Sequence, residues 1–229
     1  LANFITYHNL LHPDSFPIVF ARRFSTFKRA ALVFQQFERV VRLAKDQQRP
    51  VQFIFAGKAH PRDDEGKRFI QHIIHLSKHT ELHGHLVFLE NYDIHIARQM
   101  VSGCDVWLNN PRRPLEASGT SGQKTSAHGC LNMSIMDGWW REAYDGTNGF
   151  AIGGDHHPDR IEEQDRIDSE NLYKVLEEEV INTFYNRDAS GVPRQWIGKI
   201  RRAMSTITPE YSTWRMVQDY ATQYYLAGQ

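Results

Sequence analysis

The sequence has few cysteines, no excess of charge of either sign and no long apolar run. Its two cysteines, Cys104 and Cys130, are too few for a disulfide framework, and their apolar neighbours predict reduced core residues in a cytoplasmic protein. Lysine plus arginine number 27 and aspartate plus glutamate also 27, so composition does not indicate binding to nucleic acid or to an anionic membrane. No apolar stretch reaches membrane-spanning length, and the first residues do not have the pattern of a signal peptide. These absences favour a globular, non-membrane protein.

The 229 residues, 41% of them hydrophobic and 12% aromatic, are enough to bury a core. Short apolar runs alternate with stretches of helical periodicity. We predict six strands, over residues 17–21, 51–57, 85–92, 104–110, 131–140 and 149–154. Strands that are apolar throughout and alternate with helices indicate a parallel sheet covered on both faces, which is a doubly wound α/β fold.

After about residue 160 the pattern becomes helical and charged, and we predict closing helices over 169–185, 196–207 and 210–226. The expected organisation is therefore one domain over 1–229, with a sheet region to about 160 and closing helices from about 161. In such folds ligands bind at the carboxyl ends of the strands.

One glycine-rich segment, EASGTSGQKTSAHG (Glu116–Gly129), lies at such a place. Its small residues allow a ligand to approach the backbone, and free N–H groups at a helix N-terminus favour an anion. Thr120 or Ser121 is the expected N-cap, and Lys124 follows Thr120 by about one turn. The lysine could assist phosphate binding, or could form an imine with a cofactor aldehyde. The plain alternative is an ordinary strand–helix turn with a surface lysine. The spacing of a Walker motif is absent.

A second cluster, FARRFSTFKRA, places four cations near the carboxyl end of the first predicted strand: Arg22, Arg23, Lys28 and Arg29. Part of this cluster is expected to converge on the same anion site, because arginine offers a planar fork and lysine a compact charge. For Arg22 and Arg29 we favour a solvated basic turn.

The twelve histidines raise the question of a metal site. His72 and His75 are three residues apart on a predicted helix, but no cysteine or carboxylate with zinc-site spacing accompanies them, so we predict no metal. His156 and His157, in a loop near the expected cleft, are candidates for substrate contact.

Several blocks together resemble one family. EASGTSGQK followed by MDGWW resembles the pyridoxal-phosphate segment of α-glucan phosphorylases, the glycogen and maltodextrin phosphorylases, and FARRFSTFKRA resembles their phosphate-binding segment. IFAGKAHPRDDEGK and VFLENYDIHIA resemble two further blocks in the same order, and the ending YYLAGQ resembles the short bacterial and archaeal form. The resemblance implies the C-terminal half of a GT-B glycosyltransferase fold.

The resemblance also assigns roles to residues. Lys124 is expected to carry pyridoxal 5'-phosphate as a Schiff base, and Arg23 and Lys28 to hold the substrate and cofactor phosphates. The remaining residues are expected to line the cofactor (Thr120, Ser121, Gly122 and Tyr92), to bind the transferred glucosyl unit (Glu116, Ser118 and Gly119), or to line the pocket (Lys58).

The implied reaction is reversible phosphorolysis of α-1,4-glucan by inorganic phosphate, which yields glucose 1-phosphate. A phosphorylase has two domains, so the chain is expected to lack its N-terminal partner domain and to be inactive alone. A homo-oligomer is possible. Two alternatives stay open: a nucleotide-sugar glycosyltransferase such as a glycogen synthase, and a non-catalytic fragment that needs a partner chain.

Overall fold

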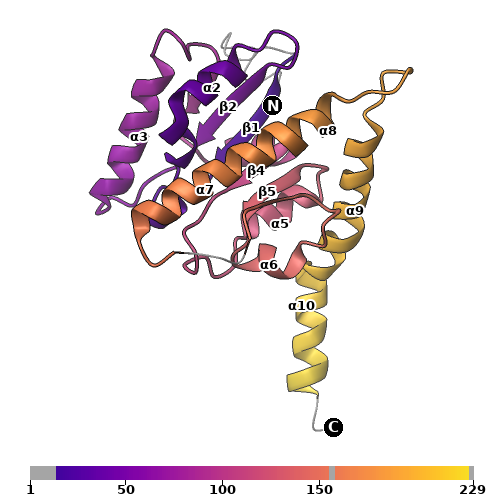
Figure 1. The fold of residues 1–229 in the computed structure, drawn as a ribbon. Helices are drawn as coiled ribbons and strands as arrows, with labels where there is room; N and C mark the ends of the chain where they lie inside the picture. The colour runs from indigo at the N-terminus through magenta and orange to yellow at the C-terminus, as the bar shows by residue number, and fades with distance from the viewer. Residues whose placement is uncertain (1–13, 155–157, 227–229) are drawn as a thin grey trace.

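The computed structural model describes residues 14–154 and 158–226. Its centre is a six-stranded parallel sheet with the order β3-β2-β1-β4-β5-β6. Figure 1 labels its strands β1, β2, β4 and β5. The strands are β1 (Phe16–Ala21), β2 (Val51–Ala56), β3 (Leu86–Leu89), β4 (Val106–Asn109), β5 (Leu131–Ile135) and β6 (Phe150–Ile152). The doubly wound α/β prediction is confirmed.

Helices connect the strands and close the domain. Short turns of 3₁₀ helix are η1 (Thr26–Lys28) and η2 (Leu32–Gln36). The α-helices between strands are α2 (Phe37–Ala44), α3 (Asp64–Ser77), α4 (Ile94–Gly103), α5 (Thr120–Ser126) and α6 (Trp139–Ala143). After β6 come α7 (Ile161–Val175), the π-helical turn η3 (Leu176–Val180), α8 (Ile181–Tyr185), α9 (Arg194–Glu210), α10 (Thr213–Tyr220) and the π-helical turn η4 (Ala221–Tyr225).

The sheet is covered on both faces, which explains why its strands are buried and mostly apolar; the polar exceptions are Gln52, Asn109, Asn132 and Ser134. Alternate residues of β1 point to opposite faces: Phe16, Ile18 and Phe20 join a large core that includes residues of α2, α3, α7 and α9. Val19 and Ala21 join a second, smaller core that includes Met100 of α4.

One predicted strand was too long. We expected a strand over 131–140, but β5 ends at Ile135, and Trp139 and Trp140 lie in α6. Gly138 adopts φ 55 and ψ −139, a conformation that ends the extended run and that glycine tolerates. Both indoles are buried, so this turn contributes to the core.

The closing helices begin near the predicted position. The helix predicted over 169–185 begins earlier, at Ile161, and runs through η3 into α8. At the C-terminal end α10 extends away from the body of the domain, and none of its eight residues is buried (Figure 1). In the part of the chain that the structure describes, no helix combines the length and apolarity that crossing a membrane requires.

Candidate functional site

The candidate site lies where the strand order changes direction. β2 and β3 follow β1 to one side of the sheet, and β4, β5 and β6 extend to the other. The loops that leave the carboxyl ends of β1 and β4 therefore diverge, and such a switch point forms the ligand crevice of open α/β sheets. Arg22 directly follows β1 and donates from Nη1 to Oδ1 of Asn109, the last residue of β4, at 2.9 Å.

A carboxylate is held between two cations at this point. Arg22 Nη2 donates to Glu116 Oε1 at 2.9 Å, and Lys28 Nζ donates to Glu116 Oε2. The three side chains are only 8%, 11% and 7% exposed for Arg22, Lys28 and Glu116. Burial lowers the pKa of Lys28, and the charges of Arg22 and Arg23 lower it further, despite the attraction of Glu116. The Arg22–Lys28–Glu116 cluster is thus a desolvated site with net positive charge.

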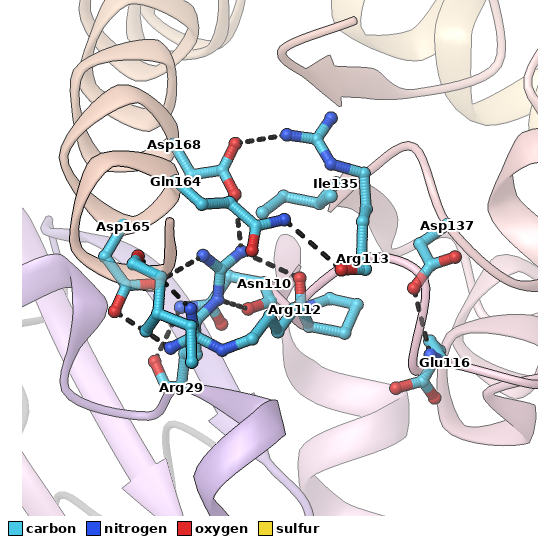
Figure 2. Close-up of polar contacts among 12 residues, drawn as sticks. Arg29, Asn110, Arg112, Arg113, Glu116, Ile135, Asp137, Gln164, Asp165 and Asp168 are labelled. Carbon is cyan, nitrogen blue, oxygen red and sulfur yellow. Dashed lines mark hydrogen bonds and ion pairs between the residues drawn. The ribbon is translucent and has the colours of Figure 1, made fainter. Parts of the chain in front are cut away.

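The loop after β5 fixes the position of Glu116. Asp137 Oδ2 accepts a hydrogen bond from the Glu116 backbone N–H at 2.9 Å (Figure 2). A Cβ atom at Gly138 would lie 2.8 Å from the carbonyl oxygens of both Glu116 and Ser118, so only glycine permits this approach. The MDG sequence therefore supports the Glu116 segment directly.

The next element, α5, carries the predicted cofactor lysine. The helix begins at Thr120 with Gly119 as its N-cap residue, at φ 111. The expected N-cap at Thr120 or Ser121 is wrong, because the left-handed conformation before the helix requires glycine. Gly122 packs onto the sheet, where Asn132 Nδ2 donates to its carbonyl oxygen at 2.9 Å.

Lys124 lines a cavity of about 290 Å³ between α4 and α5. Ser121 and His128 of the α5 region, Trp107 of β4 and Tyr92 share the same cavity. Burial raises the pKa of the Tyr92 phenol, which stays a neutral hydrogen-bonding group at neutral pH. The structure therefore gathers an amine and a hydroxyl of α5 and the phenol of Tyr92, from a distant segment of the chain, around one space.

Other predicted residues lie outside this cavity. Arg23 is exposed and makes no hydrogen bond or ion pair with the described residues, but its charge reaches the cluster and lowers the pKa of Arg22 as well as that of Lys28. Lys58 is exposed near Asp93, the N-cap of α4. Thr120 and Ser118 are exposed at the start of α5. His156 and His157 fall outside the described residues.

Two expectations about the basic cluster are wrong. Arg22 and Arg29 are not solvated: Arg22 binds Glu116, and Arg29 is 4% exposed and pairs with Asp165 and Asp168 of α7. The sequence analysis missed these two carboxylates. Their three-residue spacing on one helix face was the available signal, but nothing local connects that face to a loop more than 130 residues earlier.

Fold and site together define an α/β domain with a desolvated cationic cluster at its switch point and a lysine-lined cavity between α4 and α5. A model of the carbohydrate phosphorylase family matches residues 1–227. The chain is 47% identical to a glycogen phosphorylase of Aquifex aeolicus over 94% of the chain and 31% of that protein. It is 46% identical to a maltodextrin phosphorylase of Thermococcus litoralis over 91% of the chain and 24% of that protein.

A glycogen phosphorylase of Mycobacterium tuberculosis is 44% identical over 93% of the chain and 25% of its own length. The chain belongs to the carbohydrate phosphorylase family. It spans less than a third of the length of these relatives.

Proposed function

We propose that this chain is the cofactor-binding part of an α-1,4-glucan phosphorylase, and that its site binds pyridoxal 5'-phosphate. The observation that carries the proposal is that Lys124 lines a cavity between α4 and α5, in the domain whose switch-point loops carry the Arg22–Lys28–Glu116 cluster. The family match favours this function over a nucleotide-sugar glycosyltransferase, which has no use for a lysine that binds an aldehyde.

The residues present fit the cofactor. The Lys124 amine is the covalent attachment point, and Ser121 and Tyr92 offer hydrogen bonds within the same cavity. Trp107 lines this cavity too, and its buried indole N–H has no acceptor among the described residues, so a ligand oxygen would satisfy it. The N-terminus of α5 offers the N–H groups of Thr120 and Ser121 to a phosphate, whereas the Gly122 N–H donates to the Gly119 carbonyl oxygen at 3.2 Å.

The cationic cluster accounts for the substrate phosphate, and its Lys28 also for the phosphate of the cofactor. Two phosphates side by side repel each other, so their binding requires fixed positive charge in a desolvated place. Lys28 and Arg22 supply that charge at the crevice, and the exposed Arg23 adds a third cation at its edge. Glu116, Ser118 and Gly119 are the proposed ligands of the transferred glucosyl unit. When bound at Lys124, pyridoxal phosphate would supply a phosphate group able to exchange a proton with the substrate phosphate.

The first experiment is an absorbance scan of the purified chain with pyridoxal phosphate, followed by borohydride reduction and peptide mass mapping. We expect a pyridoxyl group on Lys124 and none in Lys124→Met. Lys78→Met is the matched control, because Lys78 is an exposed lysine at the end of α3, and we expect it to leave the labelling of Lys124 unchanged. An unmodified Lys124 in the presence of excess cofactor would contradict the proposal.

We further propose that turnover needs the rest of a phosphorylase, with glucan, inorganic phosphate and glucose 1-phosphate as its substrates and products. The chain alone is expected to release no glucose 1-phosphate from maltoheptaose and saturating phosphate, and an added N-terminal phosphorylase domain is expected to restore release. We place this activity in the cytoplasm, where the buried, unlinked Cys104 and Cys130 stay reduced. Full activity of the isolated chain would refute the need for a partner domain.

A further inference from the structure

A buried ion cluster joins α7 to the two loops that form the site. It consists of Arg29, Arg112, Arg113, Asp165 and Asp168 (Figure 2). Asp168 is fully buried, and Arg29 and Arg113 are 4% and 6% exposed. These charges lie outside the proposed cofactor cavity and the Arg22–Lys28–Glu116 cluster, and the function proposed above does not use them.

Arg29 connects three segments of the chain. Its guanidinium donates to Asp165 Oδ1 at 2.8 Å and to Asp168 Oδ2 at 2.8 Å, both on α7. It also donates to the carbonyl oxygens of Asn110 at 2.9 Å and Pro111 at 2.7 Å, in the loop after β4. Asn110 returns a hydrogen bond from Nδ2 to the Arg29 carbonyl oxygen at 2.8 Å. Arg29 thus fixes the loop after β1 against the loop after β4.

Asp168 holds both loops with one carboxylate. Its Oδ2 accepts from Arg29, and its Oδ1 accepts from Arg113 Nη2 at 2.6 Å. Arg29 directly follows Lys28, and Arg113 lies three residues before Glu116. Asp168 therefore binds one residue next to Lys28 and one residue close to Glu116 in the chain. Lys28 and Glu116 form the buried ion pair of the site.

The backbone at Arg29 shows why this support is needed. Arg29 adopts a left-handed conformation, φ 50 and ψ 47, which costs free energy for a residue with a Cβ atom. The chain turns there, so Lys28 binds Glu116 while the adjacent Arg29 binds α7. The partners of Arg29 on α7, together with the Asn110 side chain, help to offset the cost of that turn.

Buried ion pairs add little net stability compared with well-packed apolar groups, and their best-attested use is to fix one arrangement over others. We propose that Asp168 is a positioning residue, which acts through Arg29 and Arg113 to hold Glu116 against Lys28 and so to place Lys28 where it binds phosphate. This inference rests on the proposed function of the site. Asp168 itself touches neither the cofactor cavity nor the Arg22–Lys28–Glu116 cluster.

The test compares pyridoxal phosphate with pyridoxal, which lacks the phosphate. Occupancy of Lys124 is measured by mass mapping after borohydride reduction, over a range of ligand concentrations, in the wild-type chain and in Asp168→Asn. We expect Asp168→Asn to weaken the binding of pyridoxal phosphate at least tenfold and that of pyridoxal less than threefold. The ratio of the two affinities reports the phosphate contacts, and a general loss of stability would not change it.

The control is Tyr173→Phe on the same helix. Its buried hydroxyl donates to the Val33 carbonyl oxygen of η2 at 2.5 Å and makes no hydrogen bond to Arg29 or Arg113. We expect this variant to lose stability and to keep the wild-type ratio. If Asp168→Asn does not fold, Asp165→Asn decides, because Asp165 is more exposed and holds Arg29 from the same helix; we expect a loss of about threefold in the same ratio.

The outcomes separate the two proposals. If the wild-type chain prefers pyridoxal phosphate over pyridoxal and the aspartate variant keeps the full preference, the positioning role is wrong and the proposed cofactor function stands. Equal weakening of both ligands also overturns it, because that result is a structural effect. A wild-type chain with no preference for the phosphorylated ligand overturns the proposed cofactor function, and the positioning role with it.

Discussion

Replacing Glu116 by glutamine tests whether its carboxylate occupies the site as an internal counter-anion. The substitution keeps the shape of the side chain but leaves Arg22 and Lys28, both about nine-tenths buried, without their negative partner. Removal of one partner from a buried ion pair costs about 3–5 kcal/mol of unfolding free energy. We expect a loss in this range at pH 7, measured by urea unfolding with tryptophan fluorescence.

The pH dependence of this loss has a definite sign. The pKa of Lys28 is already lowered in the folded protein, and removal of Glu116 lowers it further. Between the folded and unfolded pKa values the unfolded chain binds more protons, so the stability of the variant rises with pH in that window. The deficit of Glu116→Gln relative to wild type is therefore expected to shrink as pH rises from 7 toward the ordinary lysine pKa.

Inorganic phosphate provides the second measurement. In the variant the two cations are free to bind it, whereas in the wild-type chain the carboxylate competes. Phosphate at about a hundred times its dissociation constant would add about 2.7 kcal/mol to the variant. Glu142→Gln, an exposed carboxylate on α6, is the control and is expected to stay within about 0.5 kcal/mol of wild type. A Glu116→Gln deficit that neither pH nor phosphate reduces would refute the reasoning.

Three further predictions concern the same half of the sheet. Burial raises the pKa of Asp105 to about 6 from an ordinary 3.8, so its charged form destabilises the fold progressively as pH rises through this range. In urea unfolding, Asp105→Asn should raise the free energy of unfolding by about 1–3 kcal/mol at pH 7 and leave it unchanged at pH 3. A Cβ at Gly122 would clash with Asn132 Oδ1 and lie 2.8 Å from Trp139 Cζ2. Gly122→Ala should therefore lower the free energy of unfolding by about 1–3 kcal/mol and lower the thermal midpoint. An unchanged midpoint would mean that α5 can shift. Burial raises the pKa of the Cys130 thiol well above its ordinary value, so iodoacetamide should label it only at the rate of unfolding, as mass spectrometry in increasing urea would show.

The sheet could be predicted from the sequence because both of its faces are buried. Strands such as β2, with all six residues buried, leave an apolar run broken only by Gln52, without the periodicity of an amphipathic helix. The same logic failed after β5, where two tryptophans continued the apolar run into α6. A glycine at positive φ ended the strand there, and apolarity alone does not distinguish a buried strand from a buried helical turn.

The site was predictable only where its residues lie next to each other in sequence. The α5 segment and the basic loop after β1 both stood out locally, and topology brought them to one edge of the sheet. The partners of those residues were not predictable, because Arg29 meets Asp168 at a separation of 139 residues. A cationic loop has the same local sequence whether its charges face solvent or a buried carboxylate on a distant helix.

The hydrogen bond between Arg22 and Asn109 joins residues 87 positions apart, and Glu116 lies 94 positions from Arg22. Contacts between residues so far apart in sequence form late in folding, because closing the intervening loop costs conformational entropy. A partly folded chain, in which the other strands have paired but β4 has not yet docked beside β1, would still lack the binding site. A ligand of this crevice therefore binds only chains whose sheet is complete, and its addition during refolding should raise the final yield of native protein without accelerating the early steps.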